Sequence, residues 1–150
     1  MTENQRPRHQ QSSGESKVVV TGFDRFVISE PDDSGVTLVS DVLRERFTGS
    51  LVGEGTADHV RVLYPDGRHT FTGVERITGA LDGRTGSFVL TAQGYSVDGM
   101  VHGRWEVVPQ SATGELAGLR GHGVFTADTR LAADADIHAN ATDCFTYWYE

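Results

Sequence analysis

The chain has 150 residues, of which 37% are hydrophobic and 23% are charged, so its length fits a single domain. Its 13 basic and 21 acidic residues give a net charge of -8, which repels nucleic-acid phosphates and anionic lipids, so neither is an expected partner. The single cysteine, Cys144, excludes an internal disulfide and a cysteine-rich zinc site. No segment reads as a signal peptide or a membrane helix, and we expect a cytoplasmic protein.

Polar residues dominate residues 1–16, which we expect to form a disordered tail. From residue 17 onward, apolar residues alternate with period two between turn signals rich in Gly, Pro and Asp. This pattern predicts strands at residues 17–28, 36–48, 51–64, 68–80, 86–96, 100–108, 119–127 and 140–149. Residues 131–136 (LAADAD) have room for one short helical turn.

The predicted strands follow one another without long helical segments between them. Such a series favours an antiparallel meander, and closure into a barrel removes its open edges. Glycines within the strands favour a barrel over a two-layer sandwich, because strongly coiled strands bend where no side chain obstructs them. We therefore predict an all-β, eight-stranded antiparallel barrel over residues 17–150, with a sandwich as the competing architecture.

Four segments carry a distinctive pattern of glycines and large residues. They are FTGxLxGxG at 47–55, GxERxTGxLxGRxGSF at 73–88, WEVVP at 105–109 and GELxGLRG at 114–121. Through these segments the chain closely resembles a bacterial family of unknown function with the allene oxide cyclase-like barrel fold. The resemblance covers roughly residues 17–150 and implies a barrel with a lumen.

Relatives with this fold include plant allene oxide cyclase, dirigent proteins and bacterial cyclases of polyketide-derived substrates. They are described as folding an apolar substrate inside the barrel, although a shared fold does not fix function. The chain departs from the family pattern in its first strand, at Phe23-Asp24-Arg25, and in its last, at residues 145–149 (FTYWY). We expect the ends of the lumen to differ accordingly.

Glu75 is the predicted catalytic residue. It shares strand parity with Phe71 and Ile77, so it faces the lumen if they do. Apolar surroundings raise the pKa of a carboxyl group toward the range of a general acid or base. The alternative is a structural ion pair between Glu75 and an arginine such as Arg61 or Arg104.

Two further acids, Asp24 and Glu30, have equal parity on or just after the first strand and are candidate catalytic partners of Glu75. The alternative is that both side chains are exposed to solvent near the turn at Pro31, and the sequence favours this alternative more for Glu30 than for Asp24. The ligand wall is expected to combine large apolar side chains with one histidine, namely His69, Phe71, Ile77, Phe88, Trp105, Phe145, Tyr147 and Tyr149.

The six histidines fall in no metal-binding spacing, and we expect no metal and no cofactor. His59 and His69 are expected to be polar lumen groups instead. Cys144 is expected to be a small buried hydrophobic residue.

These features predict a cofactor-independent cyclase or isomerase acting in the lumen on an apolar substrate derived from a fatty acid or polyketide. The alternative is a carrier or sensor that binds a hydrophobic ligand without catalysis. The expected partners are this small molecule and, by analogy with related barrels, further copies of the chain.

Overall fold

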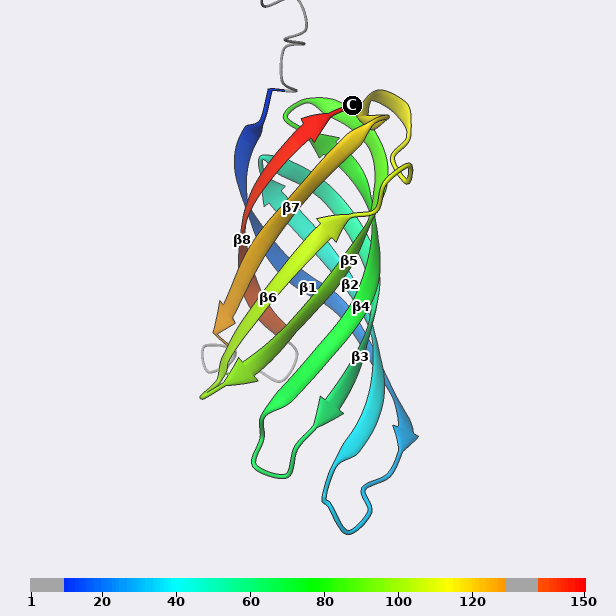
Figure 1. Ribbon diagram of the computed structural model, residues 1–150, viewed down its shortest axis with the longest axis vertical. Coiled ribbons are helices and arrows are strands. Elements are labelled where there is room, and N and C mark those ends of the chain that lie inside the picture. The colour runs from blue at the N-terminus through cyan, green and yellow to red at the C-terminus, as the bar shows by residue number, and fades with distance from the viewer. Residues whose placement is uncertain (1–9, 129–137) are drawn as a thin grey trace, which may run out of the picture.

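A computed structural model of the protein describes residues 10–128 and 138–150, which form an antiparallel barrel closed in chain order (Figure 1). Each strand pairs with the next, and the last pairs with the first, so the sheet has no open edge. This confirms the predicted eight-stranded barrel and excludes the sandwich. The strands are β1 (Ser12–Ser29), β2 (Thr37–Gly49), β3 (Leu51–Leu63), β4 (His69–Leu81), β5 (Arg84–Val97), β6 (Met100–Val107), β7 (Leu119–Asp128) and β8 (His138–Tyr149).

Tight turns join several of the strands where the sequence carries Asp-Gly. Asp82 and Gly83, between β4 and β5, have φ values of 46° and 86°, and Asp98 and Gly99, between β5 and β6, have 52° and 79°. Two consecutive residues with positive φ match the twist of a β-hairpin, and Asp and Gly tolerate this conformation. The predicted turns at these positions are therefore present.

The first strand begins earlier than the sequence pattern predicted. Residues 12–16 pair with β8, from Ser12 opposite Tyr147 to Ser16 opposite Asp143. Ser16 is buried, and its hydroxyl accepts a hydrogen bond of 3.0 Å from the backbone N–H of Leu51. The tail prediction is therefore wrong for residues 12–16. Residues 1–9 and the predicted helical turn at 131–136 lie outside the described residues.

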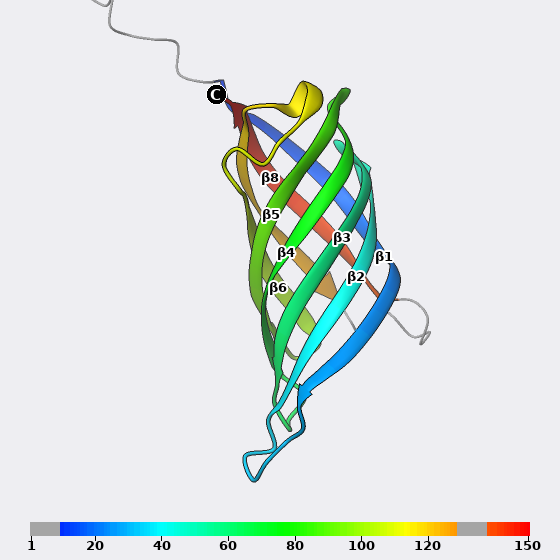
Figure 2. The same cartoon turned by 90° about the vertical axis from the view of Figure 1, so that its right-hand side faces the viewer.

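The two ends of the barrel differ in construction. At one end, the segment after β6 folds inward through a short 3-10 helix, η1 (Gly114–Leu116), and places the fully buried Leu116 over the core (Figure 2). At the other end, the β1–β2 and β3–β4 hairpins extend beyond the β5–β6 turn (Figure 1). Among the described residues, no helix has the length and apolar character needed to cross a membrane.

Buried side chains fill most of the barrel interior in two clusters. The larger lies toward the η1 end and includes Phe47, Ile77 and Phe88. The smaller consists of Phe71, Val101 and Ala127. Phe125 and Ala141 pack against both clusters. The polar residues described next lie among these apolar groups.

Candidate functional site

A cavity of about 50 Å³ lies within the barrel. By the same kind of measure a water molecule needs roughly 10–15 Å³, so the cavity has room for about three or four non-hydrogen atoms. Its wall combines aromatic and aliphatic side chains with four titratable ones. The lining residues are Val18, Glu45, Phe47, His59, Glu75, Leu90, Ala92, Trp105, Phe125, Ala141 and Asp143.

Three carboxyl groups from three strands face this cavity: Glu45 of β2, Glu75 of β4 and Asp143 of β8. Glu75 and Asp143 are only 6% and 5% exposed. Burial penalises the charged form of each, so the pKa values of all three are raised. The pKa of Asp143 reaches about 7 through burial and the nearby charge of Glu45.

Glu75 has the most strongly perturbed environment of the three. Burial, the charge of Glu45, a hydrogen bond with Glu45 and the charge of Asp143 together raise its pKa well above the ordinary value. The Glu75 carboxyl group therefore keeps its proton to higher pH than that of Glu45 and is the donor of the hydrogen bond between them. Its Oε2 atom has no hydrogen-bond partner among the described residues. The cavity therefore contains Glu75 as a neutral carboxylic acid beside a second carboxyl group, that of Glu45, whose pKa burial also raises.

Neither arginine of the alternative interpretation pairs with Glu75. Arg61 Nε donates to Asp41 at 2.7 Å. Arg104 lies on the outer face of β6, where its guanidinium donates to the side-chain oxygen of Gln93. The specific arginine pairs considered from the sequence are therefore wrong.

A charged network extends from the cavity toward the long hairpins. Asp41 is fully buried and accepts two hydrogen bonds from Arg25, at 2.8 and 2.9 Å, besides the one from Arg61. Burial alone would raise the pKa of Asp41, but the two guanidinium groups hold it below the ordinary value. This network neutralises Asp41, and the charge of Arg61 also offsets part of the rise in the pKa of Glu45.

His59 connects the network to the cavity. Its Nδ1 lies 3.1 Å from Nη2 of Arg61, which can only donate, so Nδ1 is the acceptor. Burial and the Arg61 charge lower the pKa of His59 to about 4. The ring also stacks on Phe71 at 4.9 Å between centroids. His59 is therefore a neutral imidazole in the lumen, as the sequence predicted for a polar lumen group.

The predicted wall residues lie inside the barrel, but few of them line the cavity. Trp105 does so together with Glu75. His69 is half-buried, and its Nδ1 lies 2.9 Å from the hydroxyl of Ser96. Tyr149 is partly buried under the guanidinium of Arg84. The other five are buried in the core, namely Phe71, Ile77, Phe88, Phe145 and Tyr147.

Asp24 and Glu30 do not lie in the lumen. A β-bulge between Val20 and Gly22 reverses the parity of β1, so Asp24 pairs with Val42 on the outer face and is exposed. Glu30 follows the end of β1 and is also exposed. The prediction that they are lumen acids is wrong for Asp24 because the bulge shifts the alternation by one residue, and wrong for Glu30 because this residue lies beyond the end of the strand. Cys144 is exposed on β8, so its predicted burial is wrong too.

The sequence analysis missed Glu45 and Asp143, although strand parity contained the signal. Glu45 alternates in step with Leu43 and Phe47, which are both buried. Asp143 alternates in step with Phe145 in the last strand. Strand parity alone therefore predicts that both carboxyl groups point into the barrel. Among the described residues, no group of three or more His, Cys, Asp or Glu side chains is arranged to hold a metal ion.

Comparison with known proteins agrees with this architecture. The crystal structure of a protein of unknown function from the DUF3224 family of Shewanella oneidensis MR-1 superposes with a TM-score of 0.70 at 25% identity, covering 95% of this chain and 98% of that one. A search of curated proteins gave no match. The family model described as "Protein of unknown function (DUF3224)" matches residues 13–138. Because this match spans most of the sequence, the chain belongs to the DUF3224 family.

Proposed function

We propose that the barrel is a proton-transfer enzyme, a cofactor-independent isomerase for a small carbonyl compound. The observation that carries the proposal is a pair of unpartnered atoms on cavity-lining residues. Glu75 Oε2 and Trp105 Nε1 are both buried without a hydrogen-bond partner among the described residues. Burying a polar atom without a hydrogen-bond partner costs free energy. A bound carbonyl oxygen would accept a hydrogen bond from Trp105 Nε1 and remove that cost.

The three carboxyl groups supply the acid and the base that this reaction requires. Asp143, with a pKa of about 7, is partly ionised at neutral pH and serves as the base. It removes a proton from the carbon next to the carbonyl group. Glu75, held neutral, gives up its hydrogen bond to Glu45 and transfers that proton to the carbonyl oxygen, which produces an enol. In an α-hydroxy carbonyl compound the enol is an enediol: Asp143 returns its proton to the former carbonyl carbon, and the neighbouring hydroxyl group passes its proton to Glu75, which completes the isomerisation and restores both side chains.

The size of the cavity determines the substrate class. Ligand sites of ordinary size enclose roughly 300–1,000 Å³, far more than the 50 Å³ present here. An elongated apolar substrate would require Trp105 and Phe125 to leave their positions over Gly123 and Gly103. We therefore retain the isomerase class implied by the resemblance to allene oxide cyclase-like barrels, but propose a substrate whose reacting part has about four non-hydrogen atoms.

Acetone is a suitable probe because it has four non-hydrogen atoms and exchangeable protons beside its carbonyl group. In D₂O, the wild-type protein is expected to accelerate the exchange of these protons above the buffer rate, as measured by ¹H NMR. Asp143→Asn and Glu75→Gln, which retain side-chain size, are each expected to reduce the added rate at least tenfold.

Glu54→Gln is the matched control, because Glu54 is an exposed glutamate on the outer face of β3 whose loss leaves the cavity unchanged. Its exchange rate should equal that of the wild type. Circular dichroism of each variant establishes that the barrel is folded. Exchange at the buffer rate with wild-type protein, or an undiminished rate in folded Asp143→Asn and Glu75→Gln, would contradict the proposal.

A further inference from the structure

We propose a second ligand site, on the outer face of the barrel, in which a groove across β3 to β7 binds a monocarboxylate with an unbranched apolar chain. The site is separate from the lumen and does not depend on the proposed enzymatic activity. A hollow of about 910 Å³ lies over these strands, and a second of about 650 Å³ adjoins it. The two share five lining residues and form one continuous groove: Val60, Thr72, Gln93, Arg104 and Val124.

Inward-facing glycines explain why the outer face is hollow here. Gly94 of β5 pairs with Gly103 of β6, and the rings of Phe71 and Phe125 lie against them where a Cβ would otherwise be. The ring of Trp105 lies against Gly123 of β7 in the same way. With no side chains holding the backbone away from these rings, we infer that the sheet approaches the barrel axis. The lumen is therefore narrow where the outer surface is concave.

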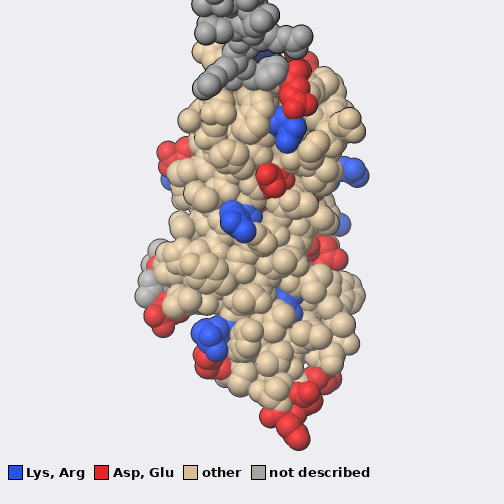
Figure 3. Space-filling view, in the orientation of Figure 1, with Lys and Arg blue, Asp and Glu red and all other residues tan. Residues whose placement is uncertain are grey.

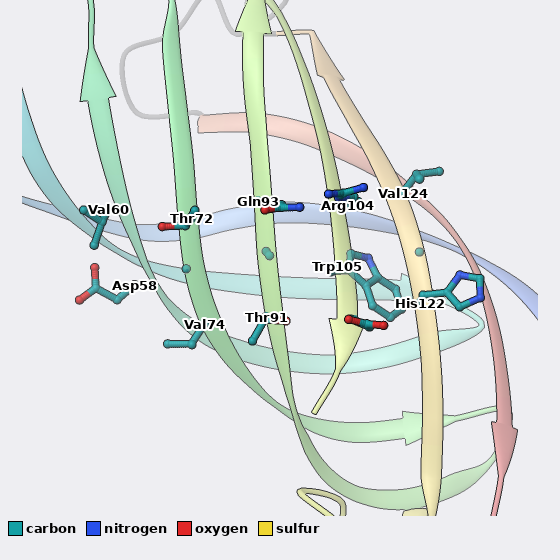
Figure 4. A pocket seen from close by; sticks show the side chains of 14 residues that line it. Asp58, Val60, Thr72, Val74, Thr91, Gln93, Arg104, Trp105, His122 and Val124 are labelled. Carbon is teal, nitrogen blue, oxygen red and sulfur yellow. The ribbon is translucent and has the colours of Figure 1, made fainter. Parts of the chain in front are cut away.

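The floor of the groove is a single row of cross-strand neighbours (Figure 4). Val60 pairs with Thr72, Thr72 with Gln93, Gln93 with Arg104, and Arg104 with Val124. Strands lie about 4.8 Å apart, so Arg104 and Val60 are separated by three spacings, roughly 14 Å. The row runs across five neighbouring strands and has one cationic side chain, which suits an extended ligand with one charged end.

Apolar side chains of the groove are unusually exposed. Val60, Tyr95 and Val124 are 47%, 50% and 58% exposed, and Val74 in the neighbouring row is 52% exposed. Figure 3 shows this face of the molecule, on which charged side chains are few and scattered. Exposed apolar side chains that line a hollow together with polar ones mark a binding site more often than apolar side chains exposed singly.

Arg104 determines the chemistry of the charged end. It forms no ion pair within 4.0 Å among the described residues, and its guanidinium is oriented only by Gln93. A carboxylate complements this unneutralised guanidinium, which accommodates it with two parallel hydrogen bonds. Asp58 and Glu106 line the adjacent row, and Asp58 accepts a hydrogen bond from Ser40 at 2.6 Å. These acids repel a carboxylate, so they confine it to Arg104 and keep the affinity moderate.

Charge also favours this ligand over a second copy of the chain. Two copies packed through this face would bring together surfaces of molecules that each carry a net charge of -8 and would bury Asp58 and Glu106 of both. A single carboxylate adds one negative charge and leaves both acids hydrated at the edge of the groove. We therefore assign the groove to a small amphipathic acid.

Decanoate, at concentrations below those at which it forms micelles, is the probe for the test. Calorimetric titration of the wild-type protein is expected to give one site with a sub-millimolar dissociation constant. In ¹H–¹³C spectra, the methyl signals of Val60 and Val124 should shift on titration. Arg104→Gln, which can still hydrogen bond to Gln93, should weaken binding at least tenfold, and 1-decanol should bind the wild type at least tenfold more weakly than decanoate does.

Arg46→Gln is the matched control because Arg46 is an exposed arginine paired with Glu54, outside the groove. It should bind decanoate like the wild type, and so should Glu75→Gln, which alters only the lumen. Three outcomes would each overturn the proposal: no decanoate binding, equal binding by folded Arg104→Gln, or a dimer in sedimentation that Val124→Asp dissociates. The last would assign the groove to a second copy. Failure of the acetone test alone would leave this site unaffected.

Discussion

Close packing between Gly55 and Glu75 is the residue-scale feature on which the lumen depends. The Oε2 atom of Glu75 occupies the place where a Cβ on Gly55 would lie, and the Phe47 ring is 3.2 Å from the same point. Gly55 pairs with Glu45 across the β2–β3 ladder. The absence of a side chain at position 55 is therefore what lets the two glutamates meet inside the barrel.

Gly55→Ala is expected to force the Glu75 carboxyl group out of place. Overpacking of this kind costs roughly 1–3 kcal/mol of unfolding free energy, which urea unfolding would measure. The substitution should also lower any acetone exchange activity, because Glu75 leaves its hydrogen bond with Glu45. Gly22→Ala is the control, since a Cβ there meets only the Arg44 side chain at 3.4 Å or more. Equal stability of Gly55→Ala and wild type would show that Glu75 adjusts without cost.

The hairpin end of β1, β2 and β3 depends on buried charge more than on apolar packing. Phe26, Val27 and Ile28 of β1 are 50–60% exposed, so this part of the strand buries little apolar surface. Across the same region, Asp41 of β2 connects Arg25 of β1 to Arg61 of β3. The three strands are therefore joined by one carboxylate.

Asp41→Asn is expected to cost about 3 kcal/mol or more of unfolding free energy, because it leaves the largely buried Arg61 without its counter-charge. Asp66→Asn removes an aspartate from an exposed pair with Arg68, which the solvent screens, and should have a far smaller effect. Chemical denaturation of both variants under one set of conditions makes the comparison. A cost for Asp41→Asn as small as that for Asp66→Asn would mean that the network contributes little to stability.

Most strands could be predicted at this scale, because period-two alternation and Asp-Gly turns are local signals. Asp24 shows where that approach fails. The bulge at Val20 and Gly22 leaves no mark in the hydrophobic pattern, yet it exchanges inner and outer faces from Gly22 to Val27, where a second register shift follows. The prediction of a disordered tail failed at residues 12–16 for another reason. These residues are ordered by pairing with β8, which is remote in sequence. The prediction that Glu75 faces the lumen is correct because β4 pairs with β3 without a bulge, from Leu81 opposite Leu51 to His69 opposite Leu63.

At the scale of the whole molecule, the interior and the exterior of the barrel are coupled. Sequence parity predicted which residues point inward but not how much space they leave, because that depends on rings such as Phe125 crossing over glycines of neighbouring strands. The lumen is consequently small and acidic, while the larger hollow lies outside. The concentration of carboxyl groups in the interior also determines how the stability of the entire barrel responds to pH.

Two sets of buried groups act in opposite directions on that response. His59 and His69 have pKa values of about 4 in the folded protein because of burial and the charge of Arg61, so they reduce stability as pH falls from about 6.5 toward 4. Glu75 and Asp143 have raised pKa values. The unfolded chain ionises them near pH 4, whereas the folded protein keeps them protonated, so they reduce stability as pH rises. Above pH 7 the histidines no longer titrate, and the carboxyl groups dominate.

The unfolding free energy of the wild-type protein is therefore expected to fall between pH 7 and pH 8.5, mainly through Glu75, because Asp143, with a pKa of about 7, has made most of its contribution by pH 7. Urea unfolding followed by tryptophan fluorescence at several pH values would measure this fall. Glu75→Gln should flatten this profile most and Asp143→Asn less, and the double variant should be nearly independent of pH over this range. Glu54→Gln removes a carboxyl group from the outer face and should retain the wild-type slope. A wild-type profile that is flat or rising above pH 7 would mean that the interior carboxyl groups are already ionised in the folded barrel, and Glu75 could not then be the acid of the proposed reaction.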